Sequence, residues 1–131
     1  MKYFKLIEFT RSATAKKLGI ENNPSAEAIC NIKKLVKNVL DPAREYLEMP
    51  IVITSGYRSR RVNDIVGGVP SSQHCTGHAA DISTSVYYME KLFNYIKNAL
   101  IYDQLIYYKD KGFIHVSYVS HRKNRMQVII R

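Results

Sequence analysis

The sequence predicts an α+β domain in which helices pack on an antiparallel sheet. Two observations lead to this fold class. Apolar residues recur at helical spacing before residue 40 and again over residues 89–100, and three short segments with strand character close the chain. The 131 residues fit one domain over residues 1–131, because compact domains most often have about 100–150 residues.

The first third of the chain contains most of the predicted helices. Residues 12–18 form a short helix that ends at Gly19, because glycine readily adopts the left-handed conformation found at helix ends. Asn23-Pro24 predicts the start of the longest helix, since proline fits the first helical position. Its apolar stripe consists of Ala28, Ile29, Ile32, Leu35, Val36 and Val39. Pro42 lacks a backbone N–H, so we expect a break or kink before residues 43–47.

A strand and a long loop follow. Residues 51–54 are mostly β-branched and predict a strand. Residues 55–81 are rich in glycine and serine and show no periodicity, which predicts a loop with one helical turn at residues 62–66. Loops of this length in small domains usually carry function.

The rest of the chain predicts one helix and three strands. The helix covers residues 89–100, with Ser83, Thr84 or Ser85 as its cap. The strands cover residues 104–108, 113–119 and 125–130.

The charge of the chain indicates an anionic partner without identifying it. Twenty Lys and Arg residues against eleven Asp and Glu residues give a net charge of +9. Nucleic acid, a membrane surface and an anionic cell-wall polymer all fit, and a solvated basic surface is the simplest explanation. No apolar run approaches the roughly 20 residues of a membrane span. We expect Cys30 and Cys75 to be free thiols.

Three residues of the second half could hold a metal ion. His74 and Asp81 lie in the long loop, and His115 lies on the strand face opposite Ile114 and Val116. Two imidazoles and one carboxylate form a known catalytic zinc set that leaves a position free for water. Histidines at such spacing are also common as hydrogen-bonded structural residues, so the residue types alone leave both interpretations open.

The surrounding motif resembles a known family. The pattern Ser72-x-His74-x-x-Gly77-x-Ala79-x-Asp81, followed after a helix by a strand with a single His115, is similar to that of the zinc D-alanyl-D-alanine carboxypeptidases. That family includes D,D-dipeptidases and phage L-alanoyl-D-glutamate endolysins. The resemblance covers nearly the whole chain, because it continues through residues 9–13, 39–42, 53–59, 62–63 and 67–68.

The resemblance implies a zinc-bearing cleft and a peptidase activity. Zinc would be held by His74, Asp81 and His115, and the enzyme would hydrolyse D-Ala-D-Ala or a nearby amide in the peptide stem of bacterial peptidoglycan. Arg58 would stabilise the carbonyl oxygen or the oxyanion, since a guanidinium stays charged. Pairing with Asp64 is the structural alternative for this arginine.

Further residues of the motif have weaker expected roles. Ser72 and Gln73 would orient the loop or the substrate, and Tyr57 could contact substrate in the cleft. Cys75 is a rival zinc ligand because thiolates bind zinc well. We expect His78 to lie near the site or on the surface, and His121 to be solvent exposed.

One departure from the family concerns the general base. Many members have a Glu or Asp three residues before the last histidine, where this chain has Gly112. We predict that Asp110 takes this role, with Tyr108 and His78 as alternatives. The departure also leaves open a zinc-containing wall-binding module with weak catalysis.

The resemblance also sets the expected partner and location. The peptidoglycan stem becomes the expected partner and nucleic acid is disfavoured, while nothing in the sequence sets an oligomeric state. Residues 1–8 lack the apolar core of an export signal. We therefore expect cytoplasmic synthesis, with action at the cell wall after release or lysis.

Overall fold

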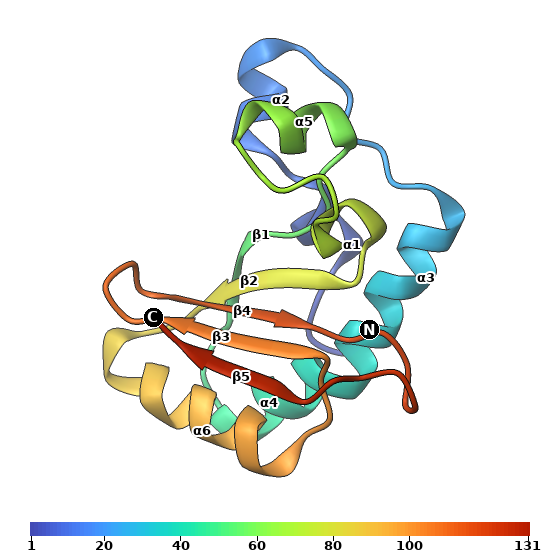
Figure 1. Cartoon of the computed structure of the whole chain (residues 1–131). Coiled ribbons are helices and arrows are strands. Elements are labelled where there is room, and N and C mark those ends of the chain that lie inside the picture. Colours follow the sequence, from blue (N-terminus) through green and yellow to red (C-terminus); the bar gives the residue numbers. More distant parts are fainter.

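A five-stranded sheet organises the computed structural model, which describes residues 1–131. The strands lie in the order β1-β2-β4-β3-β5 (Figure 1). They are β1 (Val52–Ser55), β2 (Ala79–Ser83), β3 (Gln104–Tyr108), β4 (Phe113–Ser117) and β5 (Gln127–Ile130). With helices packed on this sheet, the predicted α+β class is confirmed.

The sheet differs from the prediction at its last strand. All neighbouring strands are antiparallel except β3 and β5, which run parallel. Both edges of β4 are already paired, with β2 on one side and β3 on the other. The returning chain can therefore join only an outer edge of the sheet. Since β5 runs back against β4, it lies parallel to β3.

Strand β2 is a second difference, because its first three residues, 79–81, were predicted to be loop and no strand was predicted here. Ala79–Ser83 contains little of the β-branched or aromatic character that marks a strand from sequence. Its pairing with β1 and β4 makes it a strand, and it places Asp81 directly opposite His115. The predicted loop also contains the helix α5 (Arg60–Ile65) and the 3₁₀ turn η2 (Gln73–Thr76).

The helices follow the predicted pattern with shifted caps. They are α1 (Leu6–Thr10), α2 (Ala13–Leu18), α3 (Ala26–Leu35), α4 (Asp41–Leu47) and α6 (Met89–Ala99), and a 3₁₀ turn, η3 (Val86–Tyr88), leads into α6. Helix α1 was not predicted. Ser12 caps α2, and Gly19 ends it with a φ of 65°. Helix α3 begins at Ala26, two residues after the expected Pro24, with Ser25 as its cap. Ser85 precedes η3 rather than α6.

The expected irregularity before residues 43–47 is a π-helical turn, η1 (Val36–Leu40), between α3 and α4. The backbone N–H of Asp41 donates to Val36 O, one residue further back than in an α-helix. Pro42 has no N–H, and its ring would collide with a carbonyl of a regular preceding turn. The wider turn therefore lets the chain stay helical up to the proline and beyond it.

The two faces of the sheet have different roles. One face packs against α3, η1, α4 and α6, and its fully buried residues include Ala80, Ile82, Leu105, Ile114 and Val116. Figure 1 shows α2 and α5 on the side of the sheet away from α4 and α6. The opposite face carries Asp81 and His115, because side chains alternate along each strand.

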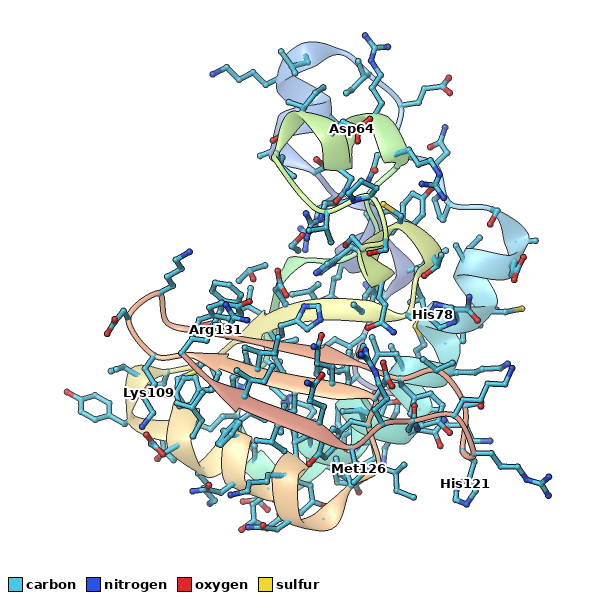
Figure 2. The ribbon with its side chains drawn as sticks, viewed as in Figure 1. Asp64, His78, Lys109, His121, Met126 and Arg131 are labelled. Atoms are coloured by element: carbon cyan, nitrogen blue, oxygen red, sulfur yellow. The ribbon has the colours of Figure 1, made fainter.

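The remaining surface predictions hold. Cys30 and Cys75 are free thiols, and His121 is exposed in the segment between β4 and β5 (Figure 2). None of the helices has the length and apolar character that crossing a membrane requires.

Candidate metal centre and its cleft

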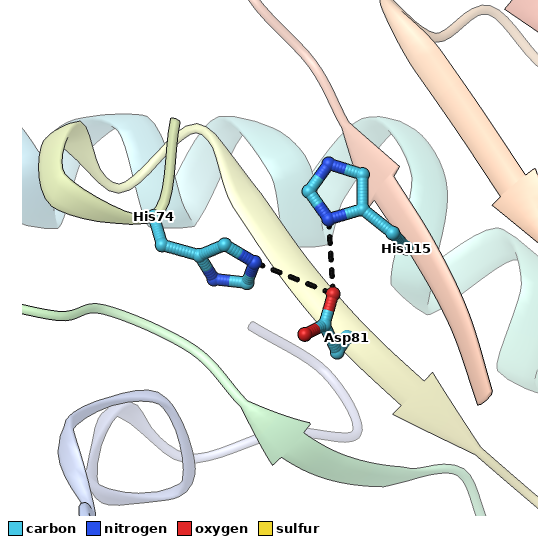
Figure 3. Close-up of side chains that lie close together, drawn as sticks. All are labelled: His74, Asp81 and His115. Atoms are coloured by element: carbon cyan, nitrogen blue, oxygen red, sulfur yellow. Dashed lines mark hydrogen bonds and ion pairs between the residues drawn. The ribbon is translucent and has the colours of Figure 1, made fainter. Parts of the chain in front are cut away.

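The structure brings His74, Asp81 and His115 together (Figure 3). They come from η2, β2 and β4, and one ligand atom from each lies within 4.8 Å of the others. Asp81 Oδ1 lies 3.3 Å from His74 Nε2 and 2.9 Å from His115 Nδ1. Both imidazoles thus face the same carboxylate oxygen.

Local backbone contacts hold His74 in this position. Nδ1 of His74 donates to the carbonyl oxygen of Gly56 at 2.7 Å, because a carbonyl can only accept. Because Nδ1 is used by the Gly56 carbonyl, Nε2 is the nitrogen that faces Asp81 and is available to a metal ion. The backbone N–H of His74 donates to Ser72 Oγ, so Ser72 caps this turn.

Gly77 ends the turn that carries His74. Its φ of 79° is a conformation that favours glycine, and a Cβ there would collide with the backbone oxygen of Ala28 in α3. The turn can therefore lie directly on α3, and the His74 ring is directed toward β2.

The histidines set the charge of Asp81. Burial alone would raise the pKa of this carboxyl group, but the hydrogen bonds with His115 and His74 outweigh burial and hold the pKa well below its ordinary range. Asp81 is therefore ionised at neutral pH, as a ligand must be.

The donor set fits a zinc ion. Two imidazole nitrogens and one carboxylate oxygen converge, one imidazole is oriented by a backbone carbonyl, and a cleft opens onto the group. Cys75 does not join the group, and burial raises the pKa of its thiol, which disfavours the thiolate form.

The three residues lie in a cleft of about 840 Å³. Loop residues 66–73 form one wall, and residues of β3 and β4 form the other. Of the predicted site residues, Arg58, Ser72 and Gln73 line it. Tyr57 instead lines a neighbouring depression of about 380 Å³, which it shares with Arg58 and Asp81.

Arg58 lies between the cleft and this depression. Its Nη1 donates to Asn63 Oδ1 at 3.2 Å, and its Nε is buried without an acceptor. The alternative partner, Asp64, is exposed on α5 and makes no ion pair with Arg58 (Figure 2). An unsatisfied buried donor lowers the free energy of unfolding by about 1–3 kcal/mol. The placement of Arg58 therefore does not serve the stability of the fold.

The sequence reasoning missed the polar residues that fix these walls. Asn63 accepts from Arg58 and donates to Val69 O at 2.8 Å, which ties the arginine to the loop. Asn22 donates to Tyr57 O and accepts from Ser59 N, which ties the same segment to the N-terminal part of the chain. Asn63 lies within the residues that carry the family resemblance but was given no role, and Asn22 stands beside Asn23 in a segment with no motif.

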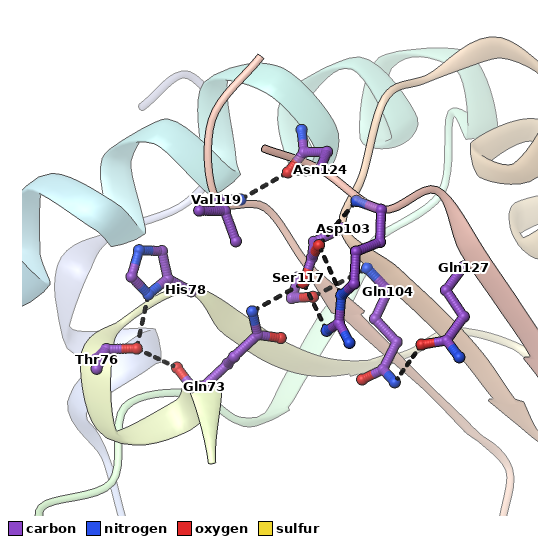
Figure 4. A network of polar contacts seen from close by, with 10 residues as sticks. Gln73, Thr76, His78, Asp103, Gln104, Ser117, Val119, Asn124 and Gln127 are labelled. Atoms are coloured by element: carbon purple, nitrogen blue, oxygen red, sulfur yellow. Dashed lines mark hydrogen bonds and ion pairs between the residues drawn. The ribbon is translucent and has the colours of Figure 1, made fainter. Parts of the chain in front are cut away.

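A second missed group surrounds Asp103. The side chain of Asp103 is only 3% exposed, and it accepts from both Arg125 and Gln73. Figure 4 shows Gln73 reaching from η2 toward Asp103. Gln73 therefore holds the turn that carries His74. An acidic residue after the apolar Leu100-Ile101-Tyr102 was a signal that could have indicated a buried, paired carboxylate.

The candidates for the general base lie in different surroundings. Asp110 is exposed in the turn between β3 and β4 and is not among the residues that line the cleft. Tyr108 does line the cleft, stacked on Phe113 with ring centroids 4.6 Å apart. His78 lies outside the cleft, hydrogen-bonded to Thr76 Oγ1 at 2.6 Å, and burial lowers its pKa (Figure 4).

Comparison with known proteins identifies a match over most of the chain. A model of the peptidase M15 family matches residues 2–117, a range that contains all three residues of the candidate metal centre. A search of curated proteins found no match.

Proposed function

The chain belongs to the peptidase M15 family, and we propose that it is a zinc peptidase of bacterial peptidoglycan. The proposed reaction is hydrolysis of D-Ala-D-Ala or a nearby amide in the peptide stem. The observation that carries this proposal is the convergence of His74, Asp81 and His115 in a large cleft.

Each residue of the centre has a defined part in the proposal. His74 Nε2, an oxygen of Asp81 and a ring nitrogen of His115 would hold zinc. Bound zinc would supply Lewis-acid chemistry, lowering the pKa of a coordinated water and polarising a carbonyl. Gly56 keeps His74 in the tautomer required for ligation, and the ionised Asp81 offsets part of the positive charge.

Arg58 is the proposed electrostatic residue. Its guanidinium is half-buried at the edge of the cleft and is fixed by Asn63. A fixed cation at this place stabilises negative charge that develops on the substrate carbonyl oxygen. Ser72 and Gln73 keep the wall in place and contact the substrate, and Tyr57 contacts it through the neighbouring depression.

We assign proton transfer to one of two residues, Asp110 in the turn between β3 and β4 or Tyr108 at the end of β3. Asp110 stays our sequence-based candidate for the general base, although its carboxylate would have to approach the cleft from the exposed turn. Tyr108 is the alternative, and its place on the cleft wall favours it, because a base must come within hydrogen-bond reach of the proton.

The charge of the cleft favours an anionic substrate. Arg58, Lys111 and Arg125 line it, while Asp81 is the only carboxylate among the lining residues. The peptide stem of peptidoglycan carries free carboxylates, so it matches this charge. Together with the overall charge of +9, this supports action at the cell wall, which we propose takes place after release or lysis.

A second candidate function is a wall-binding module that keeps the metal centre but turns over slowly. The observation that favours it is the absence of a carboxylate other than Asp81 on the cleft wall. Such a protein would bind peptidoglycan peptides but would hydrolyse them only slowly.

Purified muropeptides distinguish the two functions. We expect the zinc-loaded protein to release product peptides or D-alanine, identified by mass spectrometry, and the His115→Ala variant to release none. The exposed His121→Ala variant is the matched control and should behave like the wild type. Binding of the muropeptides without any product would support the wall-binding module instead.

A further inference from the structure

We propose that Arg125, held in place by Asp103, binds a free carboxylate of the peptide substrate. The substrate class rests on the proposed function, but the residue and its role come from the structure. Arg125 lies beyond residues 2–117 that match the family model, so the family match does not assign it.

Asp103 holds the guanidinium of Arg125 in one orientation. Arg125 Nη2 donates to Asp103 Oδ2 at 2.8 Å, and Arg125 Nε donates to Oδ1 at 3.0 Å. The backbone N–H of Arg125 donates to Oδ1 as well, at 2.9 Å. Three bonds to one carboxylate leave this arginine little freedom of orientation.

The two partners differ sharply in exposure. The side chain of Arg125 is 57% exposed and that of Asp103 is 3% exposed. Arg125 also lines the cleft that contains the metal centre, whereas Asp103 does not. Nη1 and the second proton of Nη2 are not used by Asp103, so the guanidinium has donors left for a ligand.

The same carboxylate connects this arginine to the metal centre. Gln73 Nε2 donates to Asp103 Oδ2 at 2.9 Å, and Gln73 directly precedes His74. Arg125 and the candidate zinc ligand His74 are therefore held by one buried group, on the wall of one cleft. A peptide carboxylate bound at Arg125 would be positioned relative to the scissile amide.

The chemistry of the guanidinium selects the ligand. A planar guanidinium whose orientation is already fixed loses little freedom when a carboxylate binds to its remaining donors. Lys111, on another part of the cleft wall, adds a second positive charge. A peptide stem with lysine at its third position offers two such carboxylates, the α-carboxylate of its γ-linked D-glutamate and the one at its C-terminus.

Binding and steady-state kinetics test the inference. The probes are a synthetic stem pentapeptide, its C-terminal carboxamide, and the analogue with D-isoglutamine in place of D-glutamate. We expect Arg125→Gln to raise Kd and KM for the pentapeptide by about 10- to 100-fold, with Arg125→Lys between wild type and Arg125→Gln. Whichever carboxamide removes the difference between wild type and Arg125→Gln identifies the carboxylate that Arg125 binds.

Control variants separate this role from folding. Arg122→Gln, an exposed arginine outside the cleft, should leave Kd and KM unchanged. Asp103→Asn tests the positioning role. Asparagine keeps one oxygen that can accept from Gln73, so kcat should change little, while KM for the pentapeptide should rise. The carboxamide peptide that lacks the carboxylate bound by Arg125 should show no such rise.

Each outcome has a defined meaning. Equal Kd values for wild type and Arg125→Gln, or the same increase for all three peptides, would overturn the inference. Arg125-dependent binding without any hydrolysis would keep the inference and overturn the proposed peptidase activity. A wild-type protein that binds none of the peptides would overturn both.

Discussion

The carbonyl oxygen of Gly56 lies 2.7 Å from Nδ1 of His74, at the point where the chain leaves β1. This contact fixes the protonated nitrogen of the ring and turns Nε2 toward Asp81. Gly56 is itself packed against Phe9 so closely that a Cβ would collide with its backbone. The orientation of a candidate metal ligand is thus set by the backbone of Gly56, which in turn packs on the N-terminal helix α1.

Metal content is the first prediction. The wild-type protein should carry about one zinc per chain, and His115→Ala should carry little, because the remaining two ligands hold zinc weakly. Elemental analysis measures this directly, with His121→Ala as control. Chelation should lower the Tm of the wild type but not that of His115→Ala, because a ligand bound only by the folded state stabilises it. Full zinc in His115→Ala would contradict the assignment.

Arg58 provides the second prediction. Arg58→Gln should lower kcat by about 100- to 1,000-fold, the usual effect of losing a donor to a developing oxyanion. Zinc content should stay unchanged, since the side chain of Arg58 makes no hydrogen bond to the three ligands. The backbone N–H of Arg58 donates to His74 O, and the substitution keeps this bond. Arg61→Gln, an exposed neighbour on α5, is the control. An equal loss in both variants would point to a disturbed helix instead of a lost electrostatic role.

The third prediction compares the two candidates for the base. A general base typically contributes about 100- to 10,000-fold to turnover. Because Tyr108 lines the cleft and Asp110 is exposed in the turn, we expect Tyr108→Phe to show a loss in this range and Asp110→Asn a smaller one. Turnover is measured on zinc-loaded protein. A loss confined to Asp110→Asn would establish the sequence-based assignment.

The fourth prediction concerns acid stability. The hydrogen bond from Arg125 holds the pKa of Asp103 at about 2, below its ordinary 3.8, although burial opposes this shift. The unfolded chain therefore binds this proton more readily, so the stabilisation is complete above about pH 4 and is lost as the pH falls toward 2. It amounts to roughly 2 kcal/mol at most.

Urea unfolding between pH 6 and pH 2 measures this effect. The free energy of unfolding of Asp103→Asn should be lower than that of the wild type at pH 6, and the difference should shrink across the window from pH 4 to pH 2. Asp64→Asn, an exposed acid without a hydrogen-bonded side chain, should run parallel to the wild type. A constant difference at all pH values would show that Asp103 acts through packing and not through its charge.

The sequence by itself determined the helices other than α1, four of the five strands and the identity of the candidate ligands. These features depend on local chemistry: the apolar stripe of residues 28–39, the alternation around His115, and the motif from Ser72 to Asp81. Proline and glycine marked the irregular places as well, at Pro42 and Gly19, because their backbones admit few or unusual conformations.

Only the tertiary structure decided how these parts meet. Ala79–Ser83 became a strand through its neighbours, and β5 joined β3 because both edges of β4 were occupied. The pairing of Asp103 with Arg125 and Gln73 joins residues far apart in the chain. The physical reason is the same in each case: hydrogen bonds and ion pairs between distant segments form only after packing has brought those segments together, and no local pattern encodes them.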